Sequence, residues 1–140
     1  LVNAMANSIV PKFTIITGNS FGAGNYAMCG KAYDPRLIVA WPTAQIAVMG
    51  GPQAAKVLLQ IEKSRLKAKG EEITKENEEH LLKEIIDKYN KQMSPYYAAS
   101  RLWVDDIIDP LDTRKVVSMG IEMANHAPIK SVYNVGVIQT

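Results

Sequence analysis

Short β-branched and apolar runs alternate along this chain with segments whose apolar residues recur at helical spacing. Residues 13–17 and 37–41 are typical of strands, the second of them buried, and residues 45–49 predict a third strand. Residues 1–10 have the pattern of a helix end, with no initiator methionine and no cap before it, so we expect a piece of a longer protein. Strands that alternate with helices predict α/β layering.

A glycine-rich turn joins the first strand to the next helix. Gly18, Gly22 and Gly24 lie in this turn, and a helical segment follows to about Met28. A strand, a tight turn and a helix start aim several free backbone N–H groups at one point. Such a point suits a negatively charged oxygen, either on a phosphate or on an oxyanion that forms during a reaction.

The segment from Gln60 to Lys91 is rich in charge, since half of its residues are Asp, Glu, Lys or Arg. The helix that leads into it is expected to start at Gly50-Gly51, with Pro52 at the first helical position. Apolar residues still recur at helical spacing within the segment, namely Leu81, Leu82, Ile85, Ile86 and Tyr89. The pattern predicts a charged helical arm over residues 60–91, which is either a solvated hairpin that protrudes from the domain or a docking arm for a partner.

A last helix is predicted from Asp109 to about Asn125. Asp109 is a good N-cap, Pro110 follows at the first helical position, and Asp112 falls where a capping-box carboxylate would lie. Asp105, Asp106 and Asp109 are also close enough in sequence to form an acid/base or metal cluster. No second group of oxygen or nitrogen ligands accompanies them, so a structural role is favoured and no metal site is predicted.

Composition narrows the classes of function. A length of 140 residues suffices for one core, and a net charge of +2 gives no global basic field for nucleic acid. The single cysteine, Cys29, excludes an internal disulfide, fits a reducing compartment and is expected to be a small core residue. No apolar run reaches the roughly 18 residues of a membrane span, and no basic n-region of a signal peptide opens the sequence. These features predict a cytoplasmic location with no membrane partner.

Two nucleotide-binding motifs are relevant to the glycine turn. Residues 22–27 match the G-x-G-x-x-G/A dinucleotide fingerprint and follow a strand. A Rossmann unit also needs an acidic residue about 20 positions further on, but no acid lies between Asp34 and Glu62. The G-x-x-x-x-G-K-[ST] element for a nucleotide phosphate is absent as well. The dinucleotide interpretation is therefore disfavoured.

The spacing of residues in the turn also matches a motif of serine hydrolases. Residues 18–22 match the G-x-S-x-G spacing around Ser20, but no plausible histidine and acid complete a triad downstream. His80 and His126 are formal partners, and solvated histidines are the favoured interpretation of both. What remains is a turn rich in backbone donors and poor in acid/base side chains, which suits a cofactor that carries its own reactive groups.

Three blocks of sequence carry a resemblance to a known family. They are residues 11–33, with the string Gly-Asn-Ser-Phe-Gly-Ala-Gly-Asn-Tyr, residues 41–55, with Trp-Pro-Thr-Ala-Gln, and residues 96–114, with Trp-Val-Asp-Asp-Ile-Ile-Asp-Pro. In this order and spacing they resemble the C-terminal half of biotin-dependent acyl-CoA carboxyltransferases. The glycine turn is closest in wording to the β subunits of methylcrotonyl-CoA carboxylase and differs from that of propionyl-CoA and acetyl-CoA carboxyltransferases.

The resemblance implies a crotonase-like (ClpP/crotonase) fold, a superhelix of β-β-α units from which the charged hairpin protrudes. It makes residues 1–140 the C-terminal carboxyltransferase domain of a longer two-domain subunit. The active site of this family forms between the N-terminal domain of one subunit and the C-terminal domain of another. Implied partners are thus an N-terminal carboxyltransferase domain, a biotin carboxyl carrier or biotin carboxylase subunit, and further copies of the chain in an oligomer of the hexamer-of-dimers type.

The resemblance also assigns the glycine turn a role. It places an oxyanion hole for the ureido oxygen of biotin on the backbone N–H groups of Ala23 and Gly24, with Phe21 and Gly22 shaping the approach. Carboxybiotin, carried on a partner protein, is the implied CO2 donor, and an acyl-CoA, 3-methylcrotonyl-CoA by the closest wording, is the acceptor. The biotin ring nitrogen takes the proton of the acyl-CoA, so no protein base is needed.

The sequence leaves alternatives open for the role of Gly50 and Gly51 and for the class of function. Gly50 and Gly51 either line the same pocket as cofactor-binding residues or form only a strand-to-helix turn. The family also contains carboxyltransferase subunits of biotin-dependent acyl-CoA decarboxylases, and a non-catalytic crotonase-like assembly domain is the rival class. In a eukaryote the expected compartment is the mitochondrial matrix, and the isolated chain is expected to be inactive because the thioester-binding half is absent.

Overall fold

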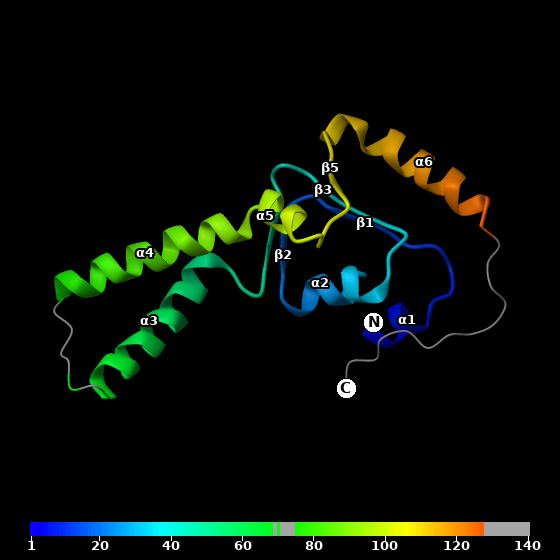
Figure 1. Cartoon of the computed structure of the whole chain (residues 1–140). Helices are drawn as coiled ribbons and strands as arrows, with labels where there is room; N and C mark the ends of the chain where they lie inside the picture. The colour runs from blue at the N-terminus through cyan, green and yellow to red at the C-terminus, as the bar shows by residue number, and fades with distance from the viewer. Residues whose placement is uncertain (69, 71–74, 128–140) are drawn as a thin grey trace.

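The computed structural model describes residues 1–68, 70 and 75–127. Its strands form two parallel sheets (Figure 1). The first sheet has the order β1 (Phe13–Ile16), β3 (Leu37–Ala40) and β5 (Asp106–Ile107). The second sheet pairs β2 (Asn19–Phe21) with β4 (Gln45–Ala47). The α/β class predicted from the sequence is confirmed.

The chain runs twice through the same β-β-α unit. The first unit is β1, β2 and α2 (Ala23–Ala27), and the second is β3, β4 and α3 (Gly51–Ala68). β1 pairs with β3 from Phe13 opposite Leu37, and β2 pairs with β4 from Asn19 opposite Gln45. Each strand of the second unit thus lies beside its counterpart in the first, as in the superhelix of β-β-α units that the resemblance implied.

Four further α-helices complete the part of the chain that the structure describes. Their bounds are α1 (Val2–Asn7), α4 (Lys75–Met93), α5 (Pro95–Ser100) and α6 (Thr113–Asn125), with 3-10 turns η1 (Lys31–Tyr33) and η2 (Pro110–Asp112). α6 packs on β1 at one close point, where a Cβ on Gly120 would lie 2.8 Å from the Phe13 ring. In the part of the chain that the structure describes, no helix has the length and hydropathy to cross a membrane.

The core lies between the two sheets. Apolar side chains from β1, β3 and β4 meet α5 and the loop after it, in a cluster of Ile16, Ile38, Ala40, Ala44, Ile46, Ala98 and Val104. A second cluster under α1 joins Ala6, Cys29 and Tyr33. Cys29, which follows α2, is therefore the small core residue that the sequence predicted.

α3 and α4 form the predicted helical hairpin, which extends away from the sheets (Figure 1). Lys63 on α3 forms a salt bridge with Glu78 on α4. Gly51 permits close packing at the base of the hairpin, since a Cβ there would lie 3.0 Å from the Asn90 Oδ1 atom. Residues 69 and 71–74 of the predicted arm lie outside the described residues.

Three local details differ from the sequence prediction. β2 lies inside the stretch expected to be turn only, and β5 was not foreseen. Asp109 caps the C-terminal segment as expected, because its carboxylate accepts a hydrogen bond from the Leu111 amide at 2.8 Å. The turn that it caps is 3-10, however, and α6 starts only at Thr113, so Asp112 forms no capping box.

Asp105 connects the start of β3 with η1 and the segment that leads into β5. One carboxylate oxygen accepts a hydrogen bond from the Ile38 amide at 2.9 Å, and the other accepts one from Lys31 Nζ at 2.6 Å. Burial raises the pKa of Asp105, but the hydrogen bonds from Lys31 and Ile38 and the charge of Lys31 together hold it below its ordinary value. A carboxyl with a lowered folded-state pKa stabilises the fold above the unfolded pKa, and the stabilisation is lost as pH falls.

We therefore expect Asp105→Asn to lower the melting temperature at pH 7 by a few degrees. The difference from the unchanged chain should shrink as the pH falls below about 4, where the native carboxyl also becomes protonated. Asp106→Asn is the matched control, because among the described residues the Asp106 carboxylate accepts a hydrogen bond only from the adjacent Ile107 amide. Thermal unfolding followed by circular dichroism from pH 3 to 7 measures this difference. A loss of melting temperature in Asp105→Asn that did not depend on pH would contradict the assignment.

Candidate functional site

The glycine turn follows β2 directly and is held against the end of β4. The Gly22 amide donates a hydrogen bond to the Ala47 carbonyl at 3.0 Å. Gly22 has φ +53° and ψ −132°, and a Cβ there would lie 2.8 Å from the Val48 carbonyl oxygen. Only glycine adopts this conformation and fits this contact without strain. Of the turn glycines, it is Gly22 that the fold requires.

Ala23 and Gly24 are the first two residues of α2, and both are exposed. The Asn25 amide donates to the Gly22 carbonyl at 3.1 Å, but neither the Ala23 nor the Gly24 amide donates to any other described residue. Two adjacent N–H groups at the start of a helix are therefore open to an external acceptor. A Cβ on Gly24 would meet no heavy atom within 4 Å, so the fold itself does not require glycine there.

The other residues assigned to the site from sequence divide into two groups. Gly50 lies against the glycine turn, since its Cβ would be 3.8 Å from the Phe21 ring. Gly51 is buried and faces α4, where its Cβ would lie 3.3 Å from the Met93 methyl carbon. The structure thus brings Phe21, Gly22 and Gly50 into one region beside the two amides, and it gives Gly51 a packing contact with the hairpin.

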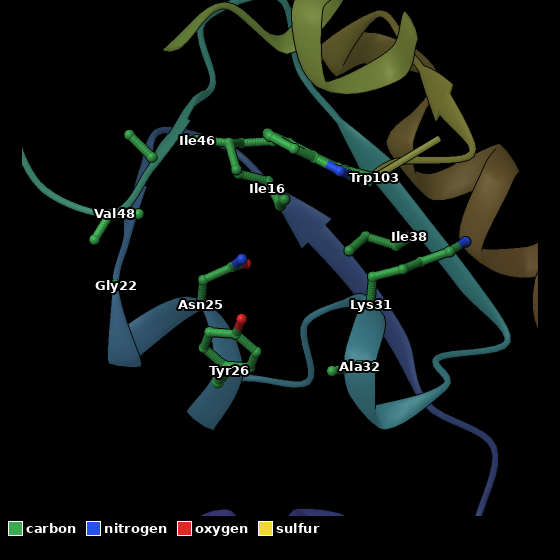
Figure 2. Close-up of a pocket in the computed structure, with 11 residues that line it drawn as sticks. Ile16, Gly22, Asn25, Tyr26, Lys31, Ala32, Ile38, Ile46, Val48 and Trp103 are labelled. Atoms are coloured by element: carbon green, nitrogen blue, oxygen red, sulfur yellow. The ribbon is translucent and has the colours of Figure 1, made fainter. Parts of the chain in front are cut away.

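A cavity of about 510 Å³ lies on the inner side of the same turn. Strand side chains such as Ile16 and Ile46 form an apolar wall, and Asn25 and Lys31 supply polar groups (Figure 2). Gly22 contributes to the lining, whereas Ala23 and Gly24 do not. No carboxylate or imidazole lines the cavity in the described part of the chain, so it offers no strong general base.

The side chains of classical catalytic type are engaged elsewhere. The Ser20 hydroxyl donates to the Asn25 side-chain oxygen at 3.0 Å, and His80 is exposed on the hairpin at 3.7 Å from Glu84. His126 is exposed at the end of α6. These positions agree with the expectation that neither histidine belongs to a triad with Ser20.

The aspartates near β5 accept hydrogen bonds that have a structural role. Asp105 binds the Ile38 amide, Asp106 the Ile107 amide and Asp109 the Leu111 amide. Among the described residues, no group of three His, Cys, Asp or Glu side chains is arranged to hold a metal ion. Backbone N–H groups are therefore the chemically distinctive feature of the region.

Comparison with known proteins gives this geometry a context. The family model described as the carboxyl transferase domain matches residues 1–136. The mitochondrial methylcrotonoyl-CoA carboxylase β chain of Arabidopsis thaliana is 50% identical over 130 residues, which are 93% of this chain and 22% of the relative. The biotin-dependent 3-methylcrotonyl-coenzyme A carboxylase β1 subunit of Mycobacterium tuberculosis is 47% identical over 132 residues, or 94% of this chain and 25% of the relative. The chain therefore spans about a quarter of the length of these relatives.

Solved structures agree on the fold. A transcarboxylase 12S structure, described as a hexamer assembly with methylmalonyl-coenzyme A and methylmalonic acid bound, aligns with a TM-score of 0.76 at 31% identity. The alignment covers 97% of this chain and 25% of the other. The expected crotonase-like fold is confirmed.

The glycine turn yields a test of its own geometry. Gly22→Ala should destabilise the chain by roughly 1–3 kcal/mol, because the substitution forces a strained backbone and a clash with the Val48 carbonyl. Gly18→Ala is the matched control, since a Cβ at Gly18 meets nothing within 4 Å. Urea denaturation measures both, and equal stability of the two variants would contradict the description of the turn.

Proposed function

Because the chain belongs to the carboxyl transferase domain family, we propose that it forms the biotin side of an acyl-CoA carboxyltransferase active site. The observation that carries this proposal is the pair of exposed amides at Ala23 and Gly24, for which no described residue supplies an acceptor. They follow a glycine that is fixed by Ala47 and Val48, so their direction is set by the sheet rather than by a mobile loop. Preorganised donors of this kind stabilise charge on an oxygen at little reorganisation cost.

Carboxybiotin, carried on a partner protein, would supply both the CO2 and, through its ring nitrogen, the base. The Ala23 and Gly24 amides would donate to its ureido oxygen and stabilise the negative charge that develops there when CO2 leaves. Phe21 and Gly50, which lie beside one another next to the turn, would shape the approach to the two amides. No described residue brings a carboxylate or imidazole to the lining of the neighbouring cavity, which fits a reaction whose base belongs to the cofactor.

The relatives support our proposals for the acceptor and for the assembly. The identities of 50% and 47% to methylcrotonyl-CoA carboxylase β chains favour 3-methylcrotonyl-CoA, or a similar branched acyl-CoA, as the acceptor. The hexameric transcarboxylase favours an oligomer in which another copy completes the site. A biotin carboxyl carrier or biotin carboxylase subunit and an N-terminal carboxyltransferase domain are the proposed partners. The proposed compartment is the cytoplasm, or the mitochondrial matrix in a eukaryote, as for the Arabidopsis relative.

We predict that Gly24→Val in the complete enzyme lowers the rate of carboxyl transfer by at least about 100-fold, which is the loss typical of one oxyanion donor. A branched side chain at this position would add bulk beside the two amides, and we expect it to hold the ureido oxygen away. The fold should remain intact, because nothing lies within 4 Å of the new Cβ. Gly18→Val, at a similarly open position, is the control. Transfer by Gly24→Val at a rate near that of the unchanged enzyme would show that the oxyanion assignment is wrong.

A second prediction separates an enzyme from an assembly domain. The chain alone should transfer no carboxyl group from carboxybiotin to an acyl-CoA, since it covers only about a quarter of its relatives' length. Mixing it with a separately expressed N-terminal domain should restore transfer of labelled carboxyl groups. Transfer by the chain alone would contradict the half-site proposal. No transfer by the folded mixture would favour the non-catalytic alternative.

A further inference from the structure

Tyr89 links the helical hairpin to the segment that supports the glycine turn. It lies on α4, and its hydroxyl donates a hydrogen bond to the Met49 carbonyl at 2.9 Å. The Met49 amide is also 3.3 Å from the same hydroxyl oxygen and donates to it. Within the described residues, Met49 makes no other backbone hydrogen bond. One side chain therefore satisfies both backbone groups of Met49.

Met49 belongs to a short connection without regular structure. β4 ends at Ala47 and α3 begins at Gly51, so residues 48–50 are not held by a sheet ladder or by helical bonds at Met49. The position of this connection depends on side-chain contacts, because a segment with few backbone hydrogen bonds can shift at a small cost in free energy. Tyr89 supplies the hydrogen-bonding contact at its centre.

The same connection presses on the glycine turn from two places. The Val48 carbonyl oxygen lies so close to Gly22 that a Cβ there would be 2.8 Å away. Gly50 lies beside the Phe21 ring. Met49 stands between these two contacts in the sequence, so a shift of Met49 moves the surfaces against which the turn is packed.

We propose that Tyr89 is a positioning residue that fixes the direction of the Ala23 and Gly24 amides through Met49 and Val48. The inference rests on the proposed function, since it takes these amides as the oxyanion hole. Tyr89 does not line the cavity beside the turn, and its effect would run through its hydrogen bonds to the Met49 backbone. Misplacement of a catalytic group by about 1 Å can cost about 100-fold in rate. Loosening the turn by a change at Tyr89 should therefore lower the rate less than blocking it by Gly24→Val.

The test uses Tyr89→Phe in the complete enzyme, because this change removes the hydroxyl and keeps the ring that packs at the base of the hairpin. We expect kcat for carboxyl transfer to fall about 10-fold, with the KM for acyl-CoA changed by less than about twofold. Amide hydrogen exchange at Met49 should speed up in this variant. Tyr96→Phe is the matched control, because Tyr96 is 63% exposed and its hydroxyl bonds no described residue, so all three quantities should stay unchanged.

The outcomes distinguish a positioning role from a structural one. A lower melting temperature with an unchanged kcat, measured below the unfolding transition, would overturn the proposal. So would a kcat within twofold of the unchanged enzyme while Met49 exchange is accelerated. Gly24→Val measured in parallel distinguishes a failure of the role of Tyr89 from a failure of the oxyanion hole. If Gly24→Val is inactive and Tyr89→Phe fully active, only the role of Tyr89 fails; if both are fully active, the oxyanion hole itself fails.

Discussion

The contact between Gly22 and the end of β4 is the constraint on which the candidate site depends. The Ala47 carbonyl accepts a hydrogen bond from the Gly22 amide, and the Val48 carbonyl leaves no room for a Cβ at Gly22. The backbone turns sharply there, with a positive φ. This turn ends β2 and starts α2 in a single step. As a result the Ala23 and Gly24 amides lie at the surface, where no other described residue accepts a hydrogen bond from them. The parallel pairing of β2 with β4 holds the two sides of this contact in register.

Under the proposed function, this arrangement would let a chain without a catalytic triad or a metal cluster among its described residues contribute to catalysis. The candidate catalytic side chains have other partners: the Ser20 hydroxyl bonds the Asn25 side chain, and Asp106 and Asp109 accept hydrogen bonds from backbone amides. Backbone donors remain, and such donors suit a reaction in which charge develops on an oxygen of a bound cofactor. The helical hairpin, which at first looks separate from this chemistry, contacts the supporting segment through Tyr89.

Much of the fold could be predicted from the sequence, because its strongest signals are local. β-branched runs gave β1 and β3, and helical periodicity gave α3 and α4. β2 and β5 were missed for a physical reason. Asn19–Phe21 is three residues long beside glycines, and it becomes a strand only because β4, far along the chain, pairs with it. Asp106–Ile107 likewise owes its strand character to β3.

The site could be predicted in outline and not in detail. The glycine turn was evident from spacing, but spacing could not tell which glycine needs a positive φ, because that depends on the Val48 carbonyl. Gly50 and Gly51 are neighbours in sequence, yet only their tertiary contacts separate the one that lies beside Phe21 from the one packed on α4. Tyr89 fitted the apolar stripe of its helix, so no sequence signal pointed to the hydrogen bonds of its hydroxyl.

The most direct test of the central claim is a structure of the complete protein with biotin bound. The account predicts the ureido oxygen at about 2.7–3.1 Å from the amide nitrogens of both Ala23 and Gly24, with Gly22 still packed on the Val48 carbonyl. A ureido oxygen bound to other groups, with these two amides facing solvent or engaged in hydrogen bonds within the protein, would contradict it.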